Sequence, residues 1–212
     1  MAGKEKKNPA PRDVNEARTF WEDLYQVHPV EEMHWFYPAL DPDLAAALEQ
    51  LAIRRGRFLD LGAGPGTQAI ALARCGFDVT GADVSITAVR KARVRARAAG
   101  VRVRLLHDDI LFTKLQGPFD CILDRGCFHV LMPGSRPNYV QSVHRLLASS
   151  GLLFLKCFSH RQPGSAGPFR FTPEEIAAAF REGFDVVSIR DTVYHGNLDP
   201  SPKALFGILR RV

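Results

Sequence analysis

A buried strand, three closely spaced glycines and the start of a helix limit the folds available to this chain. The strand is RFLDL at residues 57–61, and the run DLGAGPG covers residues 60–66. Glycine accepts a positive φ and lets the backbone approach a ligand without a Cβ in the way. Pro65 suits the first turn of a helix, where its missing N–H is not needed. The free N–H groups and the dipole at such a helix start favour a carboxylate or phosphate, so the turn predicts a binding site.

Beyond this turn, apolar runs alternate with helical patterns. The predicted strands cover residues 57–61, 77–83, 101–106, 119–124, 151–158, 184–195 and 203–212. Helices are predicted from Pro65 to Cys75, from a Ser85 cap to Gly100, from Pro137 to Ala148, and after Thr172, which forms a capping box with Glu175. The alternation predicts an α/β fold: a doubly wound, mostly parallel, seven-stranded sheet with helices on both faces. The last two strands add an antiparallel C-terminal hairpin.

The segment that precedes the sheet is helical and rich in aromatic residues, including both tryptophans, Trp21 and Trp35. We predict a disordered tail at residues 1–13, a helical aromatic-rich lid at residues 14–50 and a ligand-binding domain at residues 51–212. Large aromatic side chains supply burial whether they cover one end of the sheet or close over a ligand, so the covering role is the alternative to the lid.

The amino-acid composition favours one cellular compartment over others. The chain has 212 residues, 24% charged and 46% hydrophobic, which is typical of a soluble globular protein with one core. It has no apolar run near the roughly 18 residues that a membrane span needs, and no apolar segment follows the charged N-terminus. The four cysteines form no C-x-x-C pair. We therefore expect a cytoplasmic protein with reduced thiols, no membrane partner and no bound metal.

The net charge of +5 comes from one region. Residues 86–106 contain seven Arg or Lys and no Asp or Glu, so the remainder is net negative. Arg90, Arg93 and Arg97 share one helical face, and no aromatic residue lies among them, as a single-strand-binding surface would require. The pattern favours a solvated face and argues against nucleic acid, with a patch for RNA or an acidic partner as the alternative.

Further polar residues follow the later strands. Asp83 comes about 20 residues after Gly62, where an acid accepts ribose hydroxyls. Asp124, Arg125 and His129 follow the fourth strand, at the edge where a doubly wound sheet forms its ligand crevice. The usual pKa of histidine, about 6.5, suits His129 to a general base, and a packing role is the alternative. Cys127 is expected to be a small packed residue, with a nucleophile or metalloid ligand as the alternative.

The glycine run differs from the dinucleotide fingerprint, whose third glycine would fall on Thr67. It resembles motif I of the class I S-adenosylmethionine-dependent methyltransferases. The DRGCFH stretch at residues 124–129 and the tryptophan-containing prelude look like the thiopurine and tellurite-resistance branch of that family. The resemblance implies S-adenosylmethionine as the cofactor. It also implies that Asp109 bonds the adenine amino group and Ile110 packs on the ring, although Asp109 can equally cap a helix.

The site that we predict on this resemblance has two sets of residues. The cofactor-binding set is Asp60, Gly62, Ala63, Gly64, Gly66, Thr67, Asp83, Val84, Asp109, Ile110, Asp124 and Trp35. The catalytic set is Arg125, His129 and Asp124. Arg125 would favour a thiolate acceptor, and His129 would serve a hydroxyl.

The expected activity is in-line transfer of a methyl group from S-adenosylmethionine to a small-molecule nucleophile, a thiol or another soft acceptor. The alternatives are an RNA or protein methyltransferase, a non-catalytic S-adenosylmethionine-binding module and an NAD-dependent oxidoreductase.

Overall fold

A mixed sheet of eight strands forms the centre of the computed structural model, which describes residues 13–165 and 167–212. The strand order is β3-β2-β1-β4-β5-β8-β7, and β6 pairs with β5 outside this path. The strands are β1 (Arg57–Leu61), β2 (Asp78–Asp83), β3 (Arg104–His107), β4 (Phe119–Arg125), β5 (Leu147–Ser159), β6 (Arg170–Phe171), β7 (Phe184–Val193) and β8 (Lys203–Arg211). The pairings of β8 with β5 and β7 are antiparallel and the others are parallel.

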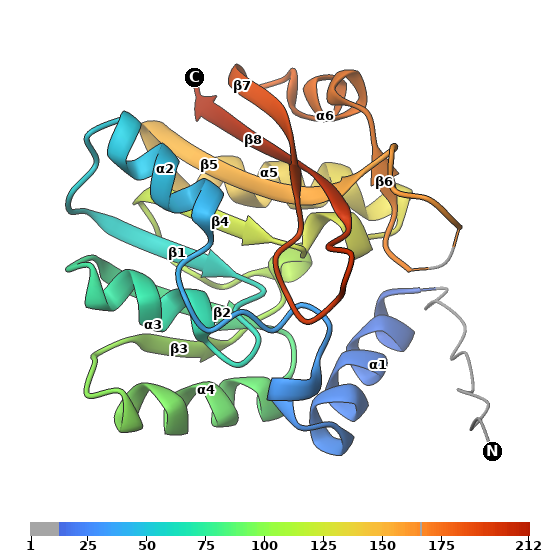
Figure 1. Cartoon of the computed structure of the whole chain (residues 1–212). Coiled ribbons are helices and arrows are strands. Elements are labelled where there is room, and N and C mark those ends of the chain that lie inside the picture. Colours follow the sequence, from blue (N-terminus) through green and yellow to red (C-terminus); the bar gives the residue numbers. More distant parts are fainter. Residues whose placement is uncertain (1–12, 166) are drawn as a thin grey trace.

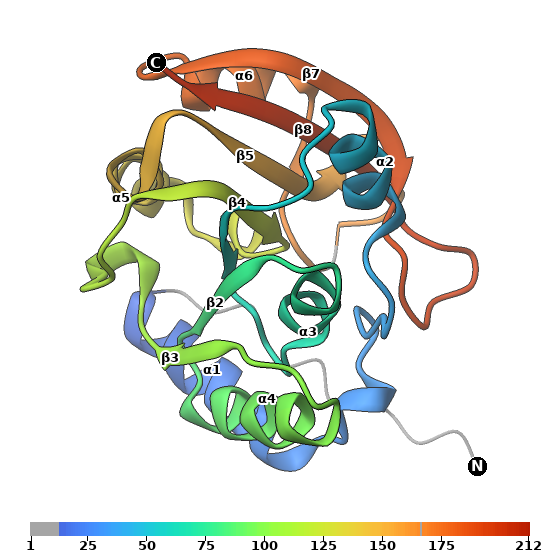
Figure 2. The same cartoon turned by 90° about the vertical axis from the view of Figure 1, so that its left-hand side faces the viewer.

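Helices cover both faces of this sheet (Figures 1 and 2). The α-helices are α1 (Val14–Val27), α2 (Pro42–Gln50), α3 (Thr67–Arg74), α4 (Ile86–Ala98), α5 (Arg136–Leu146) and α6 (Pro173–Phe180). The 3-10 helices are η1 (Val30–Glu32), η2 (Ile110–Phe112), η3 (Phe128–Val130) and η4 (Pro133–Ser135). Successive side chains of a strand point to opposite faces. Accordingly, Leu59 and Leu61 of β1 pack in the core with α5 and α6, whereas Phe58 packs in the core with α2 and α3.

The predicted doubly wound sheet and its C-terminal hairpin are confirmed. Four details differ. Helix α3 begins at Thr67 with Gly66 as its N-cap, so Pro65, predicted in the first helical turn, lies before the helix. Helix α5 ends at Leu146, before the predicted Ala148, because Leu147 already pairs with Phe119 in the sheet. Strand β3 begins at Arg104, later than predicted, because the Val101 N–H still caps α4 by donating to the Ala96 carbonyl. The two-residue β6 follows the predicted loop at residues 159–169.

The pairing register of β1, β2 and β4 places the predicted acidic residues at one edge of the sheet. Leu61 pairs with Asp124 across β1 and β4, and Asp83 is the last residue of the parallel neighbour β2. Asp60 of β1 therefore lies at the same carboxyl end of the sheet as Asp83 and Asp124. Helix α1 lies beyond this edge, beside α4 (Figure 1).

Two predictions concern the ends and the surroundings of the chain. Residues 1–12 of the predicted tail lie outside the described residues, and Asp13 is the N-cap of α1. Among the helices of the described ranges, none combines the length and the apolar character that crossing a membrane requires.

Candidate active site

The glycine turn after β1 is held in a conformation that only glycine fits. Gly62, Gly64 and Gly66 all have positive φ values, of 68°, 53° and 79°. A Cβ would also meet a neighbour at each position: the Cys127 side chain at 3.1 Å, the Tyr25 hydroxyl at 2.6 Å and the Ala92 side chain at 2.9 Å, respectively. The turn therefore lies tightly packed beneath Tyr25 and beside α4, with Gly66 as the N-cap of α3.

Asp83 orders this turn from the end of β2. Its Oδ2 accepts a hydrogen bond from the Gly64 N–H at 2.8 Å, and its Oδ1 accepts one from the Ser85 N–H at 2.8 Å. Burial raises the pKa of Asp83 to about 6, against the lowering effect of these two hydrogen bonds. Because a carboxylate oxygen has more than one acceptor position, both oxygens can still accept a ligand hydroxyl. Val84, the next residue, accepts at its carbonyl from His107.

A small cavity of about 30 Å³ lies over the turn. Its lining joins the turn to the aromatic prelude and to the end of β4: Tyr25, Trp35, Phe36, Asp60, Gly62, Ala63, Gly64, Pro65, Thr67, Gln68 and Arg125. Within the described ranges, Asp60 Oδ2 is buried and has no hydrogen-bond partner. Burial raises the pKa of Asp60 to about 7. An unpartnered buried carboxylate oxygen is costly, so this cavity suits a ligand that brings a positive charge.

The aromatic wall of the cavity is held by buried polar contacts. We call residues 35–43 the strap. The Gln68 side chain accepts from the Asp41 N–H at 2.8 Å and donates to the carbonyls of Tyr37 and Ala39. The Arg125 guanidinium donates to the Trp35 carbonyl at 3.0 Å and to Asp41 at 2.9 Å. The strap is thus fixed to both sides of the glycine turn.

A buried ionic cluster anchors the strap to the sheet. Lys156 of β5 is fully buried, and its ammonium lies 2.7 Å from carboxylate oxygens of both Asp41 and Asp43. Burial alone would raise the pKa of Asp41, but the charges of Lys156 and Arg125 outweigh burial and lower it. Arg190 completes the cluster by donating to Asp43 at 2.6 Å.

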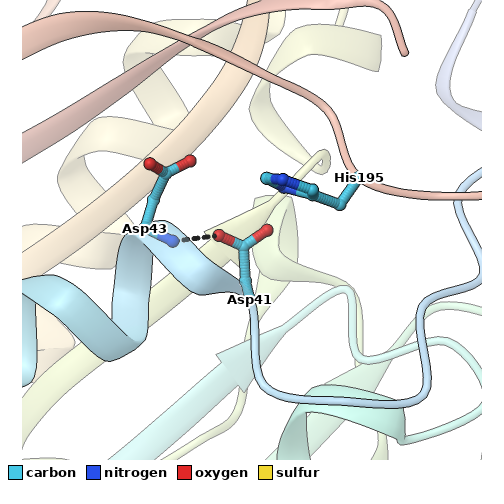
Figure 3. Close-up of side chains that lie close together, drawn as sticks. All are labelled: Asp41, Asp43 and His195. Carbon is cyan, nitrogen blue, oxygen red and sulfur yellow. Dashed lines mark hydrogen bonds between the residues drawn. The ribbon is translucent and has the colours of Figure 1, made fainter. Parts of the chain in front are cut away.

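The same cluster contains the one set of described side chains with metal-ligand geometry, Asp41, Asp43 and His195 (Figure 3). The Lys156 ammonium contacts both carboxylates and lies 3.4 Å from His195 Nδ1. Lys156 therefore supplies the positive charge that these groups require, in the place where a metal ion would bind.

Asp109 has a structural partner on each oxygen. Its Oδ1 accepts from the Leu111 N–H at 2.9 Å and caps η2, while Arg18 of α1 lies 2.6 Å from its Oδ2. The capping role is present, and the adenine role stays a prediction. Ile110 is buried in the core beside it.

Asp124 and His129 lie outside the cavity lining among the described residues. Asp124 is fully buried and accepts from the backbone N–H groups of residues 126–128 and from the Tyr139 hydroxyl. His129 Nδ1 accepts from the Phe158 N–H at 3.1 Å, and burial lowers the pKa of His129 to about 3. These surroundings favour a turn-stabilising role for Asp124 and a packing role for His129 over proton transfer. Burial raises the pKa of Cys127 well above its usual value, which favours the packed, unreactive interpretation.

Several basic side chains of helix α4 have hydrogen-bond or ion-pair partners within the molecule. Lys91 donates to the carbonyls of Tyr25 and His28, and Arg93 donates to the Leu105 carbonyl. Arg95 pairs with Glu31. Arg90 and Arg97 are exposed. These contacts agree with a solvated face that also holds the prelude.

Sequence reasoning missed several residues of this site. Tyr25 and Gln68 line the cavity, and Lys156 anchors the strap. Lys156 had a visible signal, since it is the one charged residue in the apolar run GLLFLKCF. Tyr25 follows Trp21 by one helical turn, which would have placed both on one face. Gln68 carried no signal, because its partners are backbone groups of a distant segment.

Known proteins resemble this chain in sequence. A family model described as a methyltransferase domain matches residues 58–151. An uncharacterized methyltransferase of Schizosaccharomyces pombe is 31% identical over 113 residues, which span 53% of this chain and 78% of that protein. The chain belongs to the class I S-adenosylmethionine-dependent methyltransferases. The family assignment, its cofactor and the enzymatic class are thereby confirmed, and the oxidoreductase alternative is wrong.

Two further proteins resemble this methyltransferase over a larger part of its length. A probable thiol methyltransferase of Arabidopsis thaliana is 28% identical over 153 residues, which span 71% of this chain and 68% of that protein. A solved structure, from work on the conversion of a disulfide bond into a thioacetal group during echinomycin biosynthesis, has a TM-score of 0.81 and 24% identity. The similarity covers 92% of this chain and 93% of the chain in that structure, and the two share the same fold.

The buried cluster yields a stability prediction. Lys156→Met would leave Asp41 and Asp43 short of a buried cation, which costs about 3–5 kcal/mol in the free energy of unfolding. Arg190→Met is the matched control, because the Arg190 side chain is 48% exposed and its pair with Asp43 is screened. We expect that control to cost about 1 kcal/mol or less. Urea denaturation measures both, and equal losses would contradict this account of Lys156.

Proposed function

We propose that this methyltransferase methylates a sulfur atom of a small molecule. The observation that carries the proposal is the cavity over the glycine turn. It has a carboxylate oxygen of Asp60 without a hydrogen-bond partner among the described residues, a cation at Arg125 and an aromatic wall between the strap and α1. A methyl donor with cationic groups fits the carboxylate, and an anionic thiolate fits the cation. The thiol methyltransferase and the disulfide-modifying protein among the similar proteins both act on sulfur by their names, which supports this acceptor class.

The protein's part in the reaction is binding, orientation and exclusion of water. S-adenosylmethionine supplies an electrophilic methyl group on a sulfonium. Asp60 would hold its amino end and Asp83 its ribose hydroxyls, with Asp109 and Ile110 at the adenine and the glycine turn between them. Holding acceptor and methyl carbon in line can supply about 7–11 kcal/mol of the barrier reduction. The acceptor sulfur forms the new bond to carbon as the bond from carbon to the sulfonium sulfur breaks.

Arg125 is the residue that we assign to the acceptor. A thiol loses its proton near pH 8.5, and a nearby cation favours the thiolate. Arg125, Lys156 and Arg190 together face the two carboxylates of Asp41 and Asp43, so the cluster has one positive charge in excess. Arg125 is the member of the cluster that lines the cavity. The thiol proton passes to solvent before transfer, and no protein base is required.

We propose that α1 is the moving part of the lid and that the strap is its fixed part. Polar contacts at the cofactor edge hold α1. Its Glu22 accepts from the hydroxyls of Ser85 and Thr87 at 2.7 and 2.6 Å, and its Arg18 pairs with Asp109. The Arg18 side chain is 41% exposed, so water can replace this contact readily. The strap, by contrast, is held by buried ions.

The Asp60 carboxylate gives a pH prediction. Its pKa of about 7 means that its negative charge develops between pH 6 and pH 8. A cationic ligand binds the ionised form, so affinity for S-adenosylmethionine should rise about tenfold across that interval. Calorimetric titrations at both pH values measure it. Asp60→Asn should bind weakly with no such rise, while Asp78→Asn, an exposed acid at the other end of β2, serves as the matched control. An unchanged pH dependence in Asp60→Asn would refute the assignment.

Arg125 gives a second prediction, read from the rate of S-adenosylhomocysteine formation with simple alkyl thiols against pH. The wild-type rate should level off about one pH unit below the solution pKa of the thiol. In Arg125→Met the inflection should return to about pH 8.5 and the rate at pH 7 should fall about tenfold or more, whereas Arg125→Lys keeps the low inflection. The same inflection in wild type and Arg125→Met would remove Arg125 from this role. If His129→Gln rather than Arg125→Met alters the pH profile, His129 is the residue that removes the proton from the thiol.

A further inference from the structure

Tyr25 of α1 lies directly against the glycine turn, a contact that the sequence analysis did not predict. Within α1, which the structure describes in full, Tyr25 is the only buried residue, at 4% exposure. A Cβ on Gly64 would stand 2.6 Å from the Tyr25 hydroxyl oxygen, so the absence of a side chain at Gly64 makes room for this oxygen. Tyr25 also lines the cavity together with Asp60.

The Tyr25 phenol is neutral and held in one orientation. Burial raises the pKa of Tyr25 well above its usual value, the charge of Asp83 raises it further, and a hydrogen bond from the Trp35 side chain opposes both effects. An indole N–H can only donate, so the phenol oxygen is the acceptor of that bond. Trp21 packs edge-on against Trp35, at 5.7 Å between ring centroids, and fixes the pair from behind.

The Tyr25 phenol is near two carboxylates, those of Asp83 and Asp60, which have different proposed roles. Asp83 and Asp60 both raise its pKa. Under the proposed function, on which this inference rests, Asp60 holds the amino-acid end of the cofactor and Asp83 holds the ribose. The sulfonium sulfur of S-adenosylmethionine joins those two parts covalently. Tyr25 contacts Gly64, which donates to Asp83, and lines the same cavity as Asp60, so its position suits a group that faces the sulfonium.

We infer that the Tyr25 phenol oxygen is a cofactor-binding group that recognises the methylated, cationic sulfonium. The C–H bonds of a methyl on a positive sulfur are polarised, and a neutral oxygen accepts weak hydrogen bonds from them. S-adenosylhomocysteine has a neutral thioether and no methyl there, so it loses this contact. Tyr25 therefore favours the methyl donor over the demethylated product and leaves the rest of the molecule to the other residues.

The test is the ratio of two dissociation constants. For Tyr25→Phe, the Kd of S-adenosylmethionine should rise about threefold to tenfold, and that of S-adenosylhomocysteine by less than about twofold. Calorimetry measures both without turnover. Both tryptophans of the chain lie in this wall, so intrinsic fluorescence gives an independent titration. Tyr37→Phe removes a hydroxyl from the strap outside the cavity lining and should change neither constant.

The outcomes separate this inference from the proposed function. Equal weakening of both ligands in Tyr25→Phe, or no weakening of either, would overturn the role of Tyr25 while the cofactor assignment stands. Wild-type protein that binds neither ligand would overturn the proposed function itself. If Tyr25→Phe does not fold, by its circular dichroism spectrum, Trp35→Phe takes its place. Loss of the indole donor frees the phenol, and the preference for S-adenosylmethionine should fall in the same direction.

Discussion

Asp41 connects the three parts of this protein that build its site. Its carboxylate accepts from Lys156 of β5 and Arg125 of β4, and its own N–H donates to Gln68 of α3. Through these bonds the N-terminal strap is attached to the centre of the sheet, and the Arg125 guanidinium also donates to the His195 carbonyl beyond β7. A buried ion pair is weak evidence of stability, because desolvation opposes the attraction. What this arrangement provides is position, since it sets the aromatic wall over the glycine turn.

The fold was accessible from sequence because its signals are local. Glycine spacing after β1, the Ser85 and Thr172 caps and the apolar strands each depend on neighbours in the chain, and the caps are present as predicted. The cavity required knowledge of contacts between distant segments. Tyr25 meets Gly64, and Asp41 meets Lys156, across parts of the chain that no periodicity relates. For the same reason, the sequence placed His129 near the crevice but could not show that its ring nitrogen bonds the Phe158 backbone.

The cofactor edge of the free protein carries an electrostatic cost. Burial raises the pKa values of Asp60, Asp83 and Asp124 to about 7, 6 and 6. Between their unfolded pKa of about 4 and these values, the folded chain binds more protons than the unfolded chain, so these groups lower stability as pH rises through that window. Asp124 offsets its burial with four hydrogen bonds. Asp60 is compensated less, because its Oδ2 has no hydrogen-bond partner among the described residues, and a cationic ligand would supply one more favourable interaction.

Binding of S-adenosylmethionine at the glycine turn is the central requirement of the proposed function. Calorimetric titration of the wild-type chain and of Asp83→Ala, with NAD as a comparison ligand, tests it. We predict micromolar binding of S-adenosylmethionine to the wild type and no binding of NAD. Asp83→Ala should bind S-adenosylmethionine about tenfold or more weakly, because the hydrogen bond to the Gly64 N–H that orders the turn is lost. Absence of S-adenosylmethionine binding to the wild type, or equal affinity in Asp83→Ala, would contradict the account.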